Sequence, residues 1–233
     1  MISVCIATFN GARFITEQIE SILPQLGSED EIIVSDDGST DATLAILRNL
    51  DVPQLRIVQN LGKHGYTPNF ENALCEARGE YIFLCDQDDI WQPNKVETCM
   101  QYLRDYSMVV SDARIVSADG TPISPSFFEV RHTRHGFINQ LLRFSYLGCC
   151  LAFRREVLRR ALPFPSNHRY CTHDNWLTLI ALAFHTVKII DRPLLAYRRH
   201  DNNASTGGAK QQTSLSFKIA YRAYLVRHLI CRI

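Results

Sequence analysis

The chain has 233 residues, of which 46% are hydrophobic and 21% are charged. This composition excludes disordered, collagen-like and low-complexity proteins, and the length suits one large domain or one domain with an extension. The formal net charge of +1 hides an asymmetry, because residues 1–130 carry 8 basic and 20 acidic side chains whereas residues 131–233 carry 17 and 4. The basic half is therefore expected to face phosphate, acidic lipid headgroups or nucleic acid.

The sequence also indicates where the protein resides. Its eight cysteines show no C-x-x-C spacing, which favours reduced, structural thiols. No basic segment precedes the first apolar run, so the amino terminus does not look like a secretory signal. The longest uncharged apolar stretch, residues 176–187, has about 12 residues, whereas a helix needs ~20 to span a bilayer. These features predict a cytoplasmic protein without a membrane span.

Apolar runs of β character alternate with segments of helical periodicity in the first part of the chain. The predicted strands cover residues 2–7, 31–35, 55–59 and 80–85. The predicted helices cover residues 15–26, 40–50 and 67–78, and the loop at residues 36–39 is expected to supply an N-cap for the second of them. This alternation predicts an α/β fold with a mostly parallel sheet and helices on both faces.

Polar side chains follow each of the four predicted strands. Ligands of open parallel sheets bind outside the carboxyl ends of the strands, so these side chains are expected to meet at one edge. Asp and Asn are also ordinary turn residues, but their coincidence after four strands favours a site. The residues concerned are Asn10, Asp36, Asp37, Asn60, Asp86 and Asp88.

The fourth strand leads into a cluster of carboxylates, Asp86-Gln87-Asp88-Asp89. The sequence has neither the G-x-G-x-x-G of dinucleotide dehydrogenases after its first strand nor the P-loop of NTPases, so phosphate must be bound in another way. Closely spaced carboxylates after a buried strand make an oxygen-rich site for Mg²⁺ or Mn²⁺, which bridges the oxygens of a diphosphate.

Several segments together resemble the inverting family 2 glycosyltransferases of GT-A fold. The motifs of highest specificity are VCIATFNG, EIIVSDDGSTDAT, the Asn60-Leu61-Gly62 stretch with Asn69, and GEYIFLCDQDDIW. Less tight resemblance extends to about residue 205, through LGCCLAFRRE, His173-Asp174-Asn175-Trp176 and Tyr197-Arg198-Arg199-His200 with Asn202-Asn203. The resemblance implies one GT-A domain over residues 1–205, with a nucleotide-sugar-binding half at 1–112 and an acceptor-side half at 113–205.

The resemblance assigns a nucleotide-sugar donor to the strand-end residues. Carboxylate and amide groups match the N3–H donor and the carbonyl acceptors of uracil or thymine. The implied nucleotide-binding residues are Thr8, Asn10, Asp36, Asp37, Asn60 and Asp86, with Asp86 on the ribose. Which of Asp36 and Asp37 contacts the base stays open.

The implied catalytic base is Asp174, which removes the proton of the acceptor hydroxyl as that oxygen attacks the anomeric carbon. Asp174 begins a predicted amphipathic helix over residues 175–184, so it can also act as an N-cap. The family often has an acid before this Asp, and here His173 departs from the pattern.

The leaving nucleoside diphosphate requires positive charge. By the same resemblance, Asp88 and His200 are the implied metal ligands, and Arg198 and Arg199 are implied to bind the diphosphate.

The motif Asp-Gln-Asp-Asp-Ile-Trp is similar in sequence to that of bacterial rhamnosyltransferases of polysaccharide biosynthesis that use dTDP-L-rhamnose. UDP-galactose, UDP-glucose and N-acetylhexosamine donors remain open. The implied acceptor is a saccharide hydroxyl, on a lipid-linked oligosaccharide, in O-antigen, capsule or exopolysaccharide assembly. Two alternatives are a sugar nucleotidyltransferase, which normally has a Gly-rich, basic first loop, and a catalytically inactive nucleotide-sugar-binding module. Nucleic acid is not expected as a partner, because the strand ends are acidic.

Residues 206–233 are expected to form a linker and a basic amphipathic helix over residues 214–233, in which Leu and Ile alternate with Lys and Arg. Such a helix suits the anionic inner face of the cytoplasmic membrane, which makes the enzyme a peripheral protein, or it packs on the domain. Because the implied nucleotide and metal residues all precede it, its removal is expected to leave donor chemistry intact.

Overall fold

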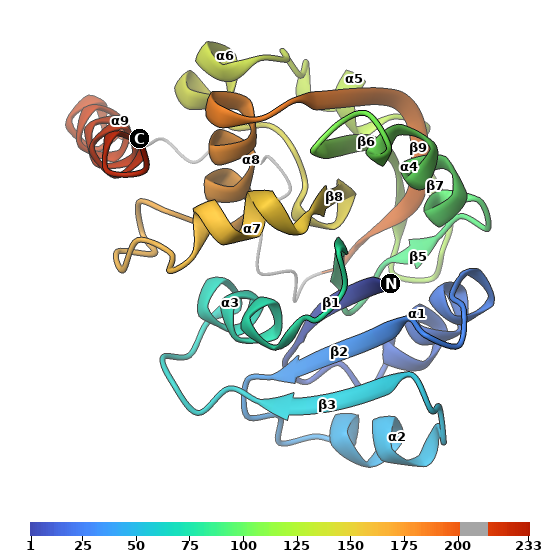
Figure 1. Ribbon diagram of the computed structural model, residues 1–233. Coiled ribbons are helices and arrows are strands. Elements are labelled where there is room, and N and C mark those ends of the chain that lie inside the picture. Colours follow the sequence, from blue (N-terminus) through green and yellow to red (C-terminus); the bar gives the residue numbers. More distant parts are fainter. Residues whose placement is uncertain (201–213) are drawn as a thin grey trace.

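The computed structural model describes residues 1–200 and 214–233 (Figure 1). Its amino-terminal half is a four-stranded parallel sheet in the order β3-β2-β1-β4. The strands are β1 (Ile2–Thr8), β2 (Glu31–Asp36), β3 (Leu55–Gln59) and β4 (Tyr81–Asp86). The interiors of β1, β2 and β4 are buried, as is typical of strands covered by helices on both faces. The four strands predicted from the sequence are confirmed.

The helices of this half also follow the prediction. They are α1 (Ile15–Ile22), extended by the 3₁₀ turn η1 (Leu23–Gln25), α2 (Thr43–Asn49) and α3 (Tyr66–Glu76). The predicted N-cap in residues 36–39 is wrong, because α2 begins only at Thr43 and its N-cap residue Ala42 has no capping side chain. The hydroxyl of Ser39 instead accepts a hydrogen bond from the backbone N–H of Asn10 at 2.9 Å.

The carboxy-terminal half continues the same sheet in the order β4-β8-β6-β9-β5, with β7 beside β6. Its strands are β5 (Ile90–Trp91), β6 (Met108–Ser117), β7 (Pro122–Ser124), β8 (Leu151–Arg154) and β9 (Val187–Arg199). Here the directions are mixed, because β8 is antiparallel to both β4 and β6 whereas β9 is parallel to β6. The parallel half and the mixed half thus share one continuous sheet.

The remaining helices cover the second half of the sheet and the side of the molecule (Figure 1). They are α4 (Lys95–Leu103), α5 (Phe127–Arg131), α6 (Phe137–Leu142), α7 (Arg155–Ala161), α8 (His173–Phe184) and α9 (Leu215–Ile230), with the 3₁₀ turn η2 (Gly148–Cys150). None of the helices in the described ranges is both long and apolar enough to cross a membrane. Asn202, Asn203 and the predicted linker at 206–213 lie outside the described residues.

Helix α8 is the most deeply embedded of these helices. Trp176, Leu177 and Ile180 are fully buried, and the Trp176 indole N–H donates to the carbonyl oxygen of Ala161 in α7 at 2.9 Å. Burying three side chains of this size stabilises the fold by roughly 1.5–3 kcal/mol each. The first turn of α8 is therefore held on a rigid support.

Candidate active site

The residues predicted from the strand ends gather at one edge of the sheet. Thr8 at the end of β1 is paired with Asp36 at the end of β2, and Ala7 is paired with Asp86 at the end of β4. Asn60 follows β3, and its backbone N–H donates to the carbonyl oxygen of Asp36 at 2.8 Å. This is the carboxyl edge, where ligands of such sheets bind.

Asp36 has one carboxylate oxygen committed to the loop and one that lacks a partner. Its Oδ2 accepts hydrogen bonds from the backbone N–H groups of Gly38 and Ser39, at 3.0 and 2.9 Å. Its Oδ1 is buried and has no hydrogen-bond partner within the part of the chain that the structure describes. A buried oxygen without a partner costs about 1–3 kcal/mol, so this atom is suited to accept a hydrogen bond from a ligand.

The neighbouring Asp37 is occupied by the protein itself. Its Oδ1 accepts from the side-chain amide of Asn60 at 2.6 Å and lies 3.1 Å from Nδ1 of His64. Its Oδ2 accepts from the backbone N–H of Gly65 at 2.7 Å. Asp37 and Asn60 therefore shape the loop after β3, which leaves Asp36 as the aspartate of this pair with an oxygen available to a ligand.

Two further side chains join the loops of this edge. Asn10, which adopts a positive φ of 51°, accepts the backbone N–H of Thr40 on its Oδ1 at 2.8 Å. Gln87 accepts the hydroxyl of Thr8 at 2.7 Å and the backbone N–H of Phe9 at 2.9 Å. Sequence reasoning missed Gln87, although its place between two carboxylates in the loop after β4 was a usable signal.

The carboxylates after β4 form a buried acidic cluster. Burial raises the pKa of Asp86 to about 7, and the charge of Asp88 adds to that rise. Burial likewise raises the pKa values of Asp88 and Asp89. Ligand atoms of Asp86, Asp89 and Cys149 all lie within 4.8 Å of one another, and Oδ2 of Asp89 is buried without a hydrogen-bond partner in the described ranges. Crowded oxygens with an unsatisfied atom fit a divalent cation such as Mg²⁺ or Mn²⁺.

The structure brings His200 to Asp88, as predicted. Nε2 of His200 lies 2.7 Å from Oδ2 of Asp88, and both side chains are about nine-tenths buried. The imidazole stacks on the ring of Phe14 with centroids 4.9 Å apart, which fixes its orientation. A carboxylate and an imidazole from distant parts of the chain thus lie together beside the acidic cluster.

Arg198 is held by contacts within the protein. Its guanidinium donates to Glu17 at 2.5 Å and to the carbonyl oxygens of Asp88 and Ala118 at 2.9 and 2.8 Å. The side chain is 4% exposed, so these contacts occupy it within the protein. Arg198 therefore holds the acidic loop in place, whereas Arg199 is exposed at the end of β9, and the diphosphate contacts of both residues stay a prediction.

Lys95 supplies a buried positive charge that sequence reasoning missed. It is fully buried, its Nζ donates to the carbonyl oxygen of Cys149 at 2.7 Å, and it lies 4.8 Å above the ring of Trp91. Its charge lowers the pKa of Asp86, against the larger effect of burial. A lysine at the start of an amphipathic helix ordinarily faces solvent, so the sequence pattern held no signal for this position.

Asp174 lies in the first turn of α8 and is not its N-cap, which is Thr172. Oδ1 of Asp174 accepts the backbone N–H of Asn175 at 2.8 Å. Cβ of Asp174 would lie 3.3 Å from a Cβ placed on Gly148, and the next residue, Cys149, has its Sγ within 4.8 Å of carboxylate oxygens of Asp86 and Asp89. The structure thus brings Asp174 to the acidic cluster.

His173 and Gly148 determine how closely the first turn of α8 packs against η2. The imidazole of His173 is stacked on Phe70 with ring centroids 4.0 Å apart. A Cβ at Gly148 would lie 2.7 Å from Nε2 of His173 and 3.3 Å from Cβ of Asp174. Glycine is therefore required for this close approach.

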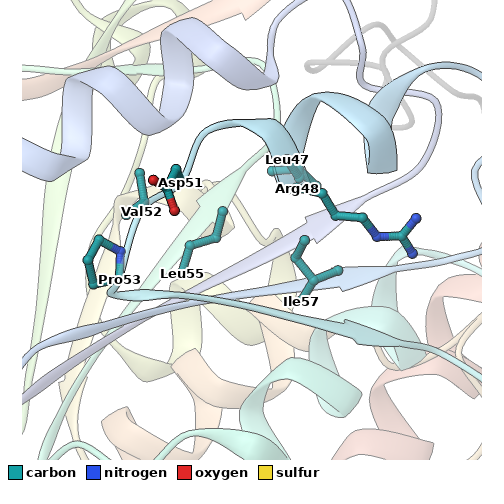
Figure 2. Close-up of a pocket in the computed structure, with 7 residues that line it drawn as sticks. All are labelled: Leu47, Arg48, Asp51, Val52, Pro53, Leu55 and Ile57. Atoms are coloured by element: carbon teal, nitrogen blue, oxygen red, sulfur yellow. The ribbon is translucent and has the colours of Figure 1, made fainter.

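A pocket elsewhere on the molecule does not belong to this site. It lies between α2 and β3 and is lined by Leu47, Arg48, Asp51, Val52, Pro53, Leu55 and Ile57 (Figure 2). None of the residues predicted for catalysis or binding lines it.

Known proteins resemble both the sequence and the fold. The family model "Glycosyl transferase family 2" matches residues 3–162. The chain is 30% identical to the dTDP-rhamnosyl transferase RfbG of Shigella flexneri, over 95% of this chain and 79% of that protein. It is 23% identical to the putative teichuronic acid biosynthesis glycosyltransferase TuaG of Bacillus subtilis, over 99% of this chain and 92% of that protein.

Two solved structures share the fold at lower identity. One is S. aureus TarS 1–349 in complex with UDP-GlcNAc, with a TM-score of 0.73 and 19% identity, over 99% of this chain and 66% of that chain. The other is the mannosyltransferase PcManGT of Pyrobaculum calidifontis in complex with GDP-Man and Mn²⁺, with a TM-score of 0.63 and 21% identity, over 99% of this chain and 62% of that chain.

Proposed function

The chain belongs to glycosyl transferase family 2 and has the GT-A fold, and from this we propose that it transfers a sugar with inversion from a nucleoside-diphosphate sugar to a saccharide hydroxyl. One observation carries the proposal: Asp174 packs against Gly148, and the neighbouring Cys149 lies within the acidic cluster at the carboxyl edge of the sheet. This arrangement would bring a base and a binding site for a leaving diphosphate to one bound sugar.

The nucleotide would occupy the ends of β1, β2 and β4. In this proposal the unpartnered Oδ1 of Asp36 accepts the N3–H of uracil or thymine, and Asp86 contacts the ribose. Thr8 and Asn10 border the base, whereas Asp37 and Asn60 support it by holding the loop after β3.

We further propose that Asp88 and His200 hold Mn²⁺ or Mg²⁺. A carboxylate and an imidazole 2.7 Å apart provide two ligands of the types that bind these ions, and the carboxylates of Asp86 and Asp89 lie in the same acidic cluster. When bound, the cation would supply positive charge to the diphosphate, and Arg199 at the end of β9 would add to it. PcManGT is a structural neighbour that was solved with Mn²⁺.

Asp174 would act as the general base of a single in-line displacement. Its carboxylate takes the proton of the acceptor hydroxyl while that oxygen bonds to the anomeric carbon and the bond to the nucleoside diphosphate breaks. Such a displacement inverts the anomeric carbon, because the acceptor oxygen attacks it from the side opposite the leaving group.

The relatives support a role in bacterial polysaccharide assembly. RfbG is named a dTDP-rhamnosyl transferase, TuaG is named for teichuronic acid biosynthesis, and TarS was solved with UDP-GlcNAc. We therefore propose dTDP-L-rhamnose or a UDP-hexose as the donor, and a lipid-linked saccharide at the inner face of the cytoplasmic membrane as the acceptor.

A thermal-shift screen tests the donor proposal. The panel is dTDP-L-rhamnose, UDP-glucose, UDP-galactose and UDP-N-acetylglucosamine, each with and without Mn²⁺. A donor at 100 times its Kd stabilises the protein by ~2.7 kcal/mol, so a clear rise of the melting temperature is expected for one donor when Mn²⁺ is present. The same rise with ATP or CTP in place of the sugar nucleotides would contradict the proposal and favour a nucleotidyltransferase.

Helix α9 has two apolar faces, which bears on the membrane proposal. Leu225 and Leu229 are buried against the domain, so packing on the domain is confirmed. A second stripe is exposed along the helix and beyond its end. It consists of Leu215, Ile219, Val226, Ile230 and Ile233, with exposed fractions of 71, 59, 37, 61 and 92%.

The basic residues of α9 and of the turn after it divide in the same way. Arg222 donates to the carbonyl oxygen of Leu142, and Arg232 donates to that of Leu162 at 2.8 Å. Lys218 and Arg227 are exposed. We propose that the exposed stripe enters the headgroup region while Lys218 and Arg227 contact acidic lipids.

The double variant Ile219→Ser, Ile230→Ser tests this surface. It is expected to sediment several-fold less with phosphatidylglycerol vesicles than the unmodified protein, because it removes the centre of the stripe. Ile123→Ser is the matched control, since Ile123 is 60% exposed on β7, away from α9. Binding should weaken between 0.1 and 1 M salt as the Debye length falls from ~10 to ~3 Å. Equal sedimentation of both variants at low salt would show that the stripe does not bind lipid.

A further inference from the structure

Helix α9 reaches the candidate active site through a polar contact. The side-chain amide of Asn175 donates a hydrogen bond to the phenolic oxygen of Tyr221 in α9. Asn175 follows Asp174 directly in the first turn of α8, and its side chain is 3% exposed. Solvent therefore cannot readily replace Tyr221 as its partner.

The rest of α9 is anchored, so this contact has a fixed geometry. The ring of Tyr224 lies 5.6 Å from that of Tyr170, and Leu225 and Leu229 of the same helix are buried. At the far end Arg232 donates to the carbonyl oxygen of Leu162. With these contacts on the loop before α8, Tyr221 is held at a set position relative to the first turn of α8.

The bond between Tyr221 and Asn175 bears directly on the carboxylate of Asp174. The backbone N–H of Asn175 donates to Oδ1 of Asp174 at 2.8 Å, so the position of Asn175 sets the orientation of that carboxylate. The negative charge of Asp174 also contributes to the rise in the pKa of Tyr221 to about 12, after the effect of burial, which agrees with their closeness.

We infer that Tyr221 is a positioning residue for glycosyl transfer, and that α9 thereby completes the active site from outside the sheet. The inference rests on the proposed role of Asp174 as the base. A base must lie within hydrogen-bond reach of the acceptor hydroxyl, and a displacement of about 1 Å can cost 10²-fold in rate. The expectation that removal of the helix leaves the chemistry intact is revised accordingly.

Tyr221→Phe tests the inference, because it removes one oxygen and keeps the ring that stacks on Phe217. The expected result is a fall in kcat of about 10-fold with an unchanged KM for the donor, since the proposed nucleotide residues lie on other elements. Tyr224→Phe is the matched control, because it removes the same oxygen from the same helix, where that oxygen accepts the backbone N–H of Asn167, and keeps the ring that packs on Tyr170. Its kcat is expected to stay within about 2-fold of the unmodified protein. The assay measures release of nucleoside diphosphate from dTDP-L-rhamnose, or from the UDP-hexose that the donor panel selects.

Hydrogen exchange gives a second measurement that does not depend on activity. Tyr221→Phe is expected to speed amide exchange in residues 173–177, at the start of α8, and Tyr224→Phe to leave that exchange unchanged. Equal kcat values and equal exchange for the two variants would overturn the inference. The roles of Tyr221 and Asp174 can be tested separately. A normal kcat for Asp174→Asn would refute the assignment of Asp174 as the base. A lowered kcat for Asp174→Asn together with a normal kcat for Tyr221→Phe would refute the role of Tyr221 alone.

Discussion

Asp174→Asn is expected to lower turnover by about 10²-fold or more, the scale expected for the loss of a general base. The amide has nearly the shape of the carboxylate, and its oxygen can still accept the backbone N–H of Asn175 that Asp174 binds at 2.8 Å. Folding and donor binding should therefore be preserved. Steady-state kinetics with the selected donor, the melting temperature and donor affinity by calorimetry measure the three effects.

A second aspartate provides the control for this substitution. Asp191 lies in β9, its side chain is 82% exposed, and Asp191→Asn makes the same chemical change away from the acidic cluster. It should leave kcat unchanged. If Asp174→Asn loses stability and donor affinity together while its kcat on bound donor is normal, Asp174 is a structural residue of the first turn of α8.

Asp88→Ala is expected to abolish transfer and to remove the Mn²⁺ dependence of nucleotide binding. The substitution deletes the carboxylate that lies 2.7 Å from His200 and therefore half of the proposed ligand pair. Calorimetric titration of Mn²⁺ into the protein, alone and with UDP, measures the loss directly. Full activity of the unmodified protein in EDTA would contradict the proposed metal site.

Asp89→Asn distinguishes the loss of the proposed metal ligand Asp88 from a general effect of removing a carboxylate from the acidic loop. Asp89 is 1% exposed, and its Oδ1 accepts the backbone N–H of Arg198 at 3.1 Å, so it binds β9 to the acidic loop. The amide keeps that bond, and the variant should retain Mn²⁺-dependent nucleotide binding with a milder loss of activity than Asp88→Ala. Equal losses in both variants would mean that Asp88 has no special place in metal binding.

The parallel half of the fold was predictable because its signals are local. Each strand from β1 to β4 is a short run rich in apolar residues, a helix follows each of the first three, and short crossovers between parallel strands leave few alternatives for their order. The polar residues after these strands then had to meet at one edge. That edge holds Thr8, Asp36 and Asp86 at adjacent strand ends.

The carboxy-terminal half was less predictable because its pairings are distant in sequence. β8 lies between β4 and β6 and runs against both, and no local pattern in residues 151–154 specifies these partners. The ion pair of Arg198 was unpredictable for the same reason. The sequence motif around Arg198 indicates a cation near a diphosphate, but it gives no sign of the ion pair with Glu17, which lies 181 positions away.

The short strand β5 has a consequence for engineering hybrids of this enzyme. Ile90 and Trp91 pair with Ala196 and Leu195 of β9, so the loop of Asp88 is fastened to β4 on one side and to β9 on the other. A chimera joined at residue 112, where the two predicted halves meet, would take β5 from one parent and β9 from the other. Residues 90–91 and β9 therefore form one packing unit, and a recombinant that exchanges residues 113–205 is expected to be more stable when residues 86–91 come from the same parent.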